Sequence, residues 1–438
     1  MQYVDNIVFA LVLIGAGYWF AKQVGTIRRN INLGKDIDRT DRKSERWSTM
    51  LRVAFGQSKM QARPIPGILH FIVYAGFLLI NIEVLEILID GLLGTHRIFH
   101  EFLGSFYDVV IGFFEILAVL VIVACVIFLI RRNVTKVKRF HSPEMKGWAF
   151  RDANNILVIE IVLMTALLTM NAAEANFAIE GAGPFAVSQY LAPLFDGFTQ
   201  STLHFVERFA WWFHILGILA FLNYLPVSKH FHIILAFPNT WFSNLDAKGR
   251  FPNMASVTKE VQMMMDPNAD PFAAPAEGDA NAEPERFGAK DVTDLNWVNL
   301  MNAYSCTECG RCTSECPANI TGKKLSPRKI MMDTRDRLTE VGAIIDANNG
   351  TFQDDGKSLL GDYITREELW ACTSCNACTQ ACPVNIDPLS IIVQMRNFLV
   401  MEESAAPQEL NIMMSNVENN GAPWQYGQAD RLNWKDEA

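Results

Sequence analysis

The chain has 438 residues, of which 50% are hydrophobic, and its mean hydropathy is above zero. It is therefore too long for one domain and too apolar for an ordinary soluble protein, so we expect a membrane part. The formal net charge of −9 hides a strong asymmetry between segments, and no basic patch with interleaved aromatic residues indicates binding to nucleic acid.

Five apolar stretches are long enough to cross a bilayer as helices, which takes about 20 residues. They cover residues 6–24, 68–89, 106–130, 156–171 and 203–225. The first is preceded by Asp5 and by no basic residue, so we expect an anchor rather than a cleaved signal peptide.

Lys and Arg residues are concentrated in two of the loops between these stretches. Ten lie between residues 28 and 63, seven lie between residues 131 and 151, and the opposite loops hold only Arg97. The positive-inside rule then predicts an inner (cytoplasmic) membrane protein whose N-terminus lies outside. Both basic loops, and everything after the fifth stretch, are expected in the cytoplasm.

The chain after the fifth stretch changes composition. An aromatic segment reaching Trp241 is expected to lie at the inner membrane interface, and a stretch rich in Ala, Pro, Asp and Glu from about Met265 to Glu285 is typical of a flexible linker. Further on, Ser326-Pro327, the capping box Thr365 to Glu368, and Asp387-Pro388 each predict the start of a helix. The sequence indicates no role for the polar tail after Ser404.

Eight of the nine cysteines form two copies of the pattern C-x2-C-x2-C-x3-C-P, and the ninth, Cys125, lies in an apolar run. In this pattern three thiolates bind one [4Fe–4S] cluster, and the fourth reaches the cluster of the other copy. The crossed scheme predicts one cluster on Cys306, Cys309, Cys312 and Cys382, and a second on Cys372, Cys375, Cys378 and Cys316. Structural zinc or disulfides are alternatives, but neither explains the third and fourth cysteines with their proline.

Three of the eight histidines lie in or next to the predicted helices at positions that suit a haem. His70 lies at the cytoplasmic start of the second apolar stretch, at a depth similar to His232, and His214 shares a helix face with His232 if the fifth helix continues past Pro226. Histidines from facing helices are a usual way to hold a cofactor, so we predict one haem b between His70 and His232. The alternative for each is an interfacial or hydrogen-bonded histidine.

A second haem has an incomplete ligand set. The partner of His214 is expected about ten residues beyond His70, where the chain has Ile80 and Asn81. Alternatively His96 or His100 could meet His204.

Acidic residues inside the apolar stretches need an explanation, because burying a charge in a membrane is costly. Glu115 and Glu160 suit either a proton path to a quinone or, as we favour, a polar contact between helices. Glu83 and Glu86 are expected to reach water at the outer end of their helix.

The apolar half, with His70, His214 and the segment Pro226 to His232, resembles the cytochrome b gamma subunit of respiratory nitrate reductase. In that family five helices hold two haems through two histidines on each of two helices. The resemblance implies that His70, His214 and His232 match three of the four ligands, while Ile80 departs at the fourth.

The cysteine-rich half, with Leu369-Trp-Ala-Cys-Thr-Ser-Cys, is similar to the C subunit of heterodisulfide reductase. Fusions of these two parts occur in membrane oxidoreductases related to heterodisulfide reductase and to electron-transfer-flavoprotein:menaquinone oxidoreductases. Such enzymes also use a module with Cys-Cys-Gly motifs, but this chain has no Cys-Cys pair and no Gly-rich dinucleotide fingerprint. A separate cytoplasmic partner, an iron–sulfur protein or a flavoprotein, is therefore expected.

The predicted fold is all-α, with a five-helix transmembrane cytochrome b bundle followed by a cytoplasmic, helical, two-cluster ferredoxin-like domain. Its expected divisions are residues 1–240 for the bundle, 241–290 for the interfacial segment and linker, 291–402 for the cluster domain and 403–438 for the tail.

The predicted function is that of an oxidoreductase subunit that passes electrons between a cytoplasmic partner and the membrane quinone pool. Flow toward quinone is favoured. The alternatives are quinol-driven reduction of a cytoplasmic disulfide, and a membrane-anchored iron–sulfur sensor without haem. Transport is disfavoured because five spans without an internal repeat do not fit inverted-repeat transporters.

Overall fold

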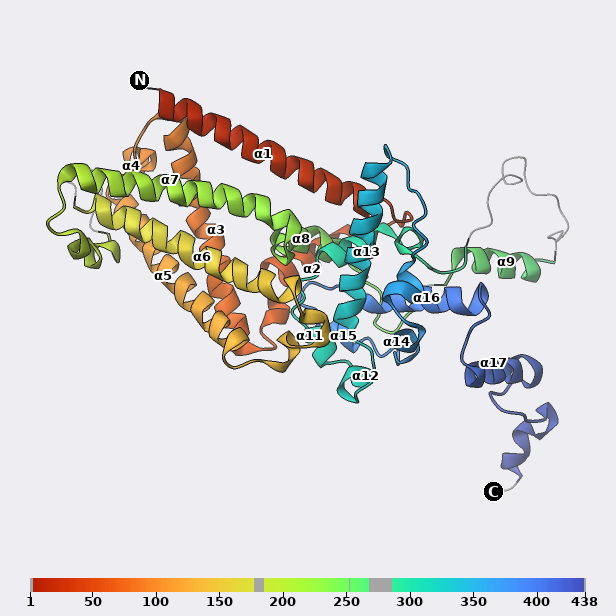
Figure 1. Cartoon of the computed structure of the whole chain (residues 1–438). Helices are drawn as coiled ribbons and strands as arrows, with labels where there is room; N and C mark the ends of the chain where they lie inside the picture. The colour runs from red at the N-terminus through yellow and green to blue at the C-terminus, as the bar shows by residue number, and fades with distance from the viewer. Residues whose placement is uncertain (1–2, 177–184, 252, 268–285, 437–438) are drawn as a thin grey trace.

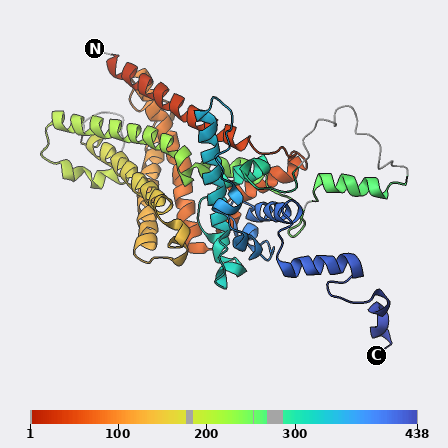
Figure 2. The same cartoon turned by 45° about the vertical axis from the view of Figure 1, so that its right-hand side comes forward.

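The computed structural model of the chain describes residues 3–176, 185–251, 253–267 and 286–436. Within these ranges the chain forms helices and turns with two isolated bridges and no strand, which confirms the all-α prediction. Figure 1 shows a bundle of long helices with shorter C-terminal helices packed against one end of it. Figure 2 shows the same arrangement from a second direction.

Five helices are long and apolar enough to cross a membrane, and they match the five predicted stretches, although the fifth helix ends one residue before its stretch. They are α1 (Val4–Ile31), α3 (Pro64–Leu93), α5 (Phe106–Asn133), α6 (Trp148–Glu174) and α7 (Gln200–Tyr224). Helices α3, α5, α6 and α7 pack in that order, and α1 lies against both α3 and α7. Their shared core includes Phe9, Ile111, Leu167 and Ile215, which are almost fully buried.

The chain breaks where α7 was expected to continue. Pro226 has no backbone N–H to donate, and the chain instead forms two short turns, η7 (Leu225–Val227) and η8 (Lys229–Phe231). Helix α8 (His232–Trp241) then begins at His232 itself. His214 and His232 therefore do not share the face of one continuous helix.

The C-terminal region has its own core. Helices α10 (Trp297–Tyr304), α13 (Pro327–Ala347) and α16 (Pro388–Met401) contribute fully buried apolar residues to it. The three predicted helix starts are confirmed, because the side chains of Ser326, Thr365 and Asp387 accept backbone hydrogen bonds from the first turns that follow them. Helix α17 (Gln408–Asn420), in the tail, was not predicted and stands away from the body in Figures 1 and 2.

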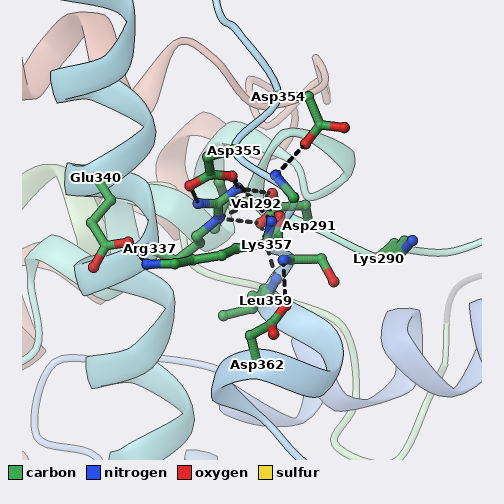
Figure 3. Close-up of polar contacts among 12 residues, drawn as sticks. Lys290, Asp291, Val292, Arg337, Glu340, Asp354, Asp355, Lys357, Leu359 and Asp362 are labelled. Atoms are coloured by element: carbon green, nitrogen blue, oxygen red, sulfur yellow. Dashed lines mark hydrogen bonds and ion pairs between the residues drawn. The ribbon is translucent and has the colours of Figure 1, made fainter.

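The 54 residues between the two cysteine motifs are organised around one fully buried arginine, shown in Figure 3. Arg337 on α13 pairs with Asp291 at 2.7 Å and with Asp355 at 2.6 Å, and it donates to the carbonyl oxygen of Lys357 at 2.8 Å. The backbone N–H of Leu359 donates to the same Asp291 at 3.1 Å. One guanidinium thus holds the loop after α13 against the segment that precedes α10.

The C-terminal region is packed directly onto the bundle. Ile31 of α1, Phe231 and Leu235 share an apolar cluster with Met301 of α10, and Arg29 pairs with Asp346 at 2.6 Å. The predicted linker lies outside the described residues from residue 268 onward, and the residues before it end in α9 (Ala255–Met265).

Replacing Arg337 with Gln should destabilise the C-terminal region, because it leaves two partly buried carboxylates without their cation. We expect a loss of about 2 kcal/mol, seen as an apparent melting temperature lower by roughly 5 °C in differential scanning fluorimetry. Arg366→Gln is the matched control, since Arg366 pairs with Glu403 near the surface. Equal effects of the two changes would contradict the prediction.

Candidate functional site

The two cysteine motifs share one backbone shape. In the first, Glu308 and Gly310 have φ of 53° and 69°, and in the second the matching residues Ser374 and Asn376 have φ of 56° and 60°. Only glycine, and to a lesser degree asparagine, adopts this left-handed conformation at little cost. Backbone N–H groups arranged this way form concave sites for anions, including iron–sulfur clusters.

The first predicted ligand set comes together in the structure. Cys306, Cys309 and Cys312 line one small cavity together with Cys382, which comes from the other motif. No three His, Cys, Asp or Glu side chains among the described residues converge on the position of a single metal ion. Four thiols around a cavity fit a cubane cluster better than a zinc ion.

The second set also combines residues of both motifs. Cys372 lies close enough to Cys375 and Cys316 to share their electrostatic environment, and Cys378 lies close to Cys372. Cys375 is exposed, whereas Cys316 and Cys378 are buried. The second set therefore faces solvent on one side.

Two of the cysteine sulfurs already accept hydrogen bonds from backbone N–H groups. The backbone N–H of Ser374 donates to Cys372 Sγ at 3.4 Å, and that of Ile386 donates to Cys382 Sγ at 3.3 Å. Burial raises the pKa of Cys306 and of Cys378 to about 12, so these thiols hold their protons at neutral pH without iron. Binding of iron would release those protons and form the thiolates.

The imidazole rings of His70 and His232 face the same space, with their centres 6.4 Å apart. Two metal–nitrogen bonds of about 2 Å, with roughly 1 Å from each nitrogen to its ring centre, would separate two axial imidazoles by about 6 Å. The observed separation therefore fits a haem iron between the two rings.

Each of these rings is held through Nδ1. His70 Nδ1 is hydrogen-bonded to Gln57 Oε1 at 3.1 Å, and His232 Nδ1 donates to the carbonyl oxygen of Lys229 at 3.1 Å. Histidines that bind metals are usually oriented in this way through their second nitrogen. The arrangement leaves Nε2 of both rings for iron.

His214 is fully buried in the bundle and follows the same pattern. Its Nδ1 donates to the carbonyl oxygen of Leu163 at 2.9 Å, while its Nε2 has no hydrogen-bond partner among the described residues. Ile80, where the resemblance places a fourth ligand, is buried and apolar. His96, one alternative ligand, instead bonds through Nε2 to Glu174 at 3.0 Å.

The prediction that Glu83 and Glu86 reach water is wrong. Both are 2% exposed and do not reach water, because the loop after α3 folds back and buries Arg97 beside them. Arg97 pairs with Glu83 at 3.3 Å and with Glu174 at 2.8 Å, and Tyr107 donates to Glu86 at 2.6 Å.

The prediction of a polar helix contact is confirmed for Glu115. This α5 side chain accepts from Asn171 of α6 at 3.1 Å and from the backbone N–H groups of Val187 and Ser188 at 2.8 and 3.2 Å. For Glu160 the same interpretation stays a prediction.

The first cysteine motif contacts the segment that carries His232. Lys229 and Glu308, whose side chains are 8% and 2% exposed, form an ion pair, and Arg335 of α13 pairs with the other oxygen of Glu308 at 2.8 Å. The same Lys229 accepts the Nδ1–H of His232 through its carbonyl oxygen. One residue thus joins the first cysteine motif to one histidine.

The same motif also contacts the segment that leads into His70. Arg311 donates to the carbonyl oxygen of Lys59 at 2.9 Å, and Lys59 donates to that of Cys382 at 3.1 Å. Gln57, two residues before Lys59, bonds to His70. The first cysteine set therefore lies against both histidine-bearing segments.

Sequence reasoning missed Gln57, Lys229, Glu308 and Arg311. The only signal was local, since Glu308 and Arg311 are charged residues between cysteines and Lys229 lies between Ser228 and two histidines. A charge beside a ligand does not reveal which distant residue it meets.

The comparisons with known proteins support the prediction that the cysteine-rich half binds [4Fe–4S] clusters. Residues 305–386 match the family described as 4Fe-4S dicluster domain. No solved structure matches the chain.

Two curated proteins match nearly the whole chain. A probable iron-sulfur-binding oxidoreductase, FadF, of Bacillus subtilis is 29% identical over 99% of this chain and 61% of its own length. EtfAB:quinone oxidoreductase of Syntrophomonas wolfei is 26% identical over 96% of this chain and 57% of its own length. The chain thus spans roughly three fifths of each of these relatives.

A third relative matches a shorter part. The C subunit of the ferredoxin/F(420)H(2)-dependent CoB-CoM heterodisulfide reductase of Methanosarcina acetivorans is 30% identical over 27% of this chain and 60% of its own length. The resemblance to oxidoreductases of the heterodisulfide reductase type and the iron–sulfur character of the C-terminal region are confirmed. The cytochrome b likeness, the haem and the quinone stay predictions.

Paired cysteine variants test the crossed ligand sets. The double change Cys306→Ser with Cys382→Ser removes two ligands of one set, so iron should fall from about eight to roughly four atoms per chain. Cys306→Ser with Cys316→Ser removes one ligand from each set and should disturb both EPR signals. Iron analysis and EPR measure both variants. If the first variant disturbs both clusters and the second removes only one, each motif binds its own cluster.

Proposed function

We propose that the chain is the electron-transfer subunit of a membrane oxidoreductase, passing electrons between a cytoplasmic partner and the quinone pool. The observation that carries this proposal is the contact of the first cysteine set with both histidine-bearing segments. A one-electron path needs its carriers close together and held in fixed positions. A sensor without haem would not require a pair of matched histidines beneath its cluster domain.

Each set of residues would hold one redox group. Cys306, Cys309, Cys312 and Cys382 would hold the cluster nearer the membrane, and Cys372, Cys375, Cys378 and Cys316 would hold the outer one. His70 and His232 would bind a haem b, and His214 is the candidate ligand for a second. These groups supply one-electron transfer when bound.

The exposed Cys375 indicates where the partner's electrons enter. Of the eight cysteines in the two motifs it alone is exposed, and it belongs to the set that would hold the outer cluster. We infer that the partner docks on the side of Cys375. This partner is an iron–sulfur protein with Cys-Cys-Gly motifs, an electron-transfer flavoprotein, or both.

Flow toward quinone is supported by the relative named EtfAB:quinone oxidoreductase, because the similarity covers both the apolar and the cysteine-rich halves. A second candidate, quinol-driven reduction of a cytoplasmic disulfide, is favoured by the similarity of the cysteine-rich half to part of a heterodisulfide reductase. Identifying the protein that co-purifies, flavoprotein or thiol–disulfide enzyme, separates the two.

The proposed setting is an inner membrane, with the N-terminus outside and the cluster domain in the cytoplasm. It is supported by the basic residues between 28 and 63 and between 131 and 151, which are typical of cytoplasmic loops. The proposed division is a bundle at residues 1–240, an interfacial segment and linker at 241–290, a cluster domain at 291–402 and a tail at 403–438.

Changing His70 or His232 to Phe should remove the haem, since each change removes one axial ligand. A pyridine haemochrome assay with protein quantification measures this loss. His230→Phe is the matched control, because the ring of His230 stacks on Phe221 at 5.2 Å and an aromatic replacement keeps that contact. If His230→Phe loses the haem and His232→Phe keeps it, the ligand is His230 and our assignment of His232 is wrong. Wild-type protein without haem would overturn the membrane half of the proposal.

Changing Lys229 to Met should slow electron transfer without removing a cofactor. The carbonyl that holds His232 remains, and Glu308 keeps Arg335, but one buried contact between the first cysteine motif and the segment of His232 is lost. We expect a roughly tenfold slower appearance of the reduced haem band after the clusters are reduced, in stopped-flow absorbance. Lys324→Met, which removes an exposed pair with Glu367, is the control and should leave the rate unchanged.

A further inference from the structure

A second feature of the molecule lies beside the proposed electron path. A cavity of about 520 Å³ is enclosed by the segment after α1, the segment after α8 and the C-terminal helices. This volume lies within the range of small-molecule sites, about 300 to 1,000 Å³. None of the proposed cluster or haem ligands lines it.

The walls of the cavity carry uncompensated positive charge. Arg39, Arg52, Lys248 and Arg250 line it, and none of them forms an ion pair with a carboxylate among the described residues. Lys59 also lines the cavity, and its Nζ donates to the backbone carbonyl oxygens of Thr379 and Cys382.

Most of the carboxylates on the same walls already have partners. Asp246 pairs with Arg42 at 2.9 Å, Asp294 pairs with Arg286 at 3.1 Å, and Asp387 accepts from the first backbone N–H groups of α16. Glu45 also pairs with Arg42, at 3.9 Å, so among the described residues Asp36 alone stands against the four cations that have no carboxylate partner.

Two buried polar atoms on these walls have no hydrogen-bond partner within the described residues. They are the donor Nε of Arg39 and the acceptor Oδ1 of Asn299, a residue that is 4% exposed. Buried donors and acceptors left unpaired are costly, so each indicates a missing partner. Burial, followed by the nearby charge of Arg46, also lowers the pKa of Arg39.

The adjacent helix carries an exposed apolar stripe. Trp47 of α2 (Lys43–Met50), and Leu51 and Phe55 of η1 (Leu51–Phe55), recur every four residues and are 55%, 54% and 56% exposed. Such an apolar stripe flanked by basic residues is typical of a helix that lies in the membrane interface. Thr49 and Val53 of the same segment face the cavity.

We propose that this cavity binds a phosphate-bearing anion that also offers a hydroxyl donor. The phosphate would take the free cations and Arg39 Nε, and the hydroxyl would donate to Asn299. Either the headgroup of an anionic phospholipid or a free phosphate compound has this chemistry. The site is independent of the proposed electron transfer, because it uses none of the same ligands.

The test uses the full chain and its apparent melting temperature, since an anion bridging both walls of the cavity stabilises their contact. One arm adds inorganic phosphate in detergent, with potassium chloride at equal ionic strength as the control. The other compares nanodiscs of phosphatidylcholine with nanodiscs that contain phosphatidylglycerol. The variant is Arg39→Gln with Arg52→Gln, and the matched control is Lys324→Gln with Arg366→Gln, which removes two cations from exposed pairs.

We expect a rise of roughly 3 to 6 °C in the wild type and in the control variant, and none in Arg39→Gln with Arg52→Gln. A rise with phosphate assigns the site to a free phosphate compound, and a rise only with phosphatidylglycerol assigns it to a lipid headgroup. No rise in either arm, or an equal rise in the cavity variant, would overturn the proposal. Equal iron content in all variants shows that they are folded.

Discussion

A buried charge pair between Lys229 and Glu308 holds the two halves of the molecule in one arrangement. Removing these charges from water costs several kcal/mol per ion, and their attraction offsets this only if every remaining polar atom is satisfied. Here Lys229 also donates to the carbonyl of Ala149 at 2.5 Å and lies 4.0 Å from Asp152, while Glu308 gains Arg335. Two cations, Lys229 and Arg335, and two carboxylates, Glu308 and Asp152, therefore balance in this docking.

This charge pair is one of several contacts between the C-terminal region and the bundle, beside the apolar cluster around Met301 and the pair of Arg29 with Asp346. A second contact from the first cysteine motif, from Arg311 to the carbonyl of Lys59, lies on the other side of Cys309. Both contacts come from the same loop, whose shape is set by the left-handed residues Glu308 and Gly310. The backbone that would surround a cluster thus also helps to hold the first cysteine set against the segments of His70 and His232.

Much of this arrangement follows from local sequence. The five spans, the helix starts at Ser326, Thr365 and Asp387, and the grouping of the cysteines depend on hydropathy, capping and spacing, which are properties of short segments. The nearness of His70 and His232 was predicted from their depth, and the structure brings them together. The wrong expectation for Glu83 arose because its partner, Arg97, is brought back by a loop fold that sequence spacing does not reveal.

Polar pairs between residues far apart in the chain could not be predicted from the sequence for the same reason. Glu308 and Lys229 are 79 residues apart, and Arg337 is 46 residues from Asp291. Each charged residue has many possible partners of opposite sign in a chain with 38 basic and 47 acidic residues. Only the packing of α10 and α13 against the bundle selects one pair from these, so such contacts require the folded structure.

The two ends of the bundle use polar groups for different purposes. At the end that contacts the C-terminal region, His70 and His232 are each fixed through Nδ1 by an uncharged oxygen, an arrangement that leaves a free nitrogen on each ring. At the opposite end, Arg97, Glu83 and Glu174 neutralise one another and join α3 to α6. Between these ends His214 faces a bundle in which Ile80 offers no second ligand. We therefore assign the proposed redox role to the end that contacts the C-terminal region and a structural role to the charged network at the opposite end.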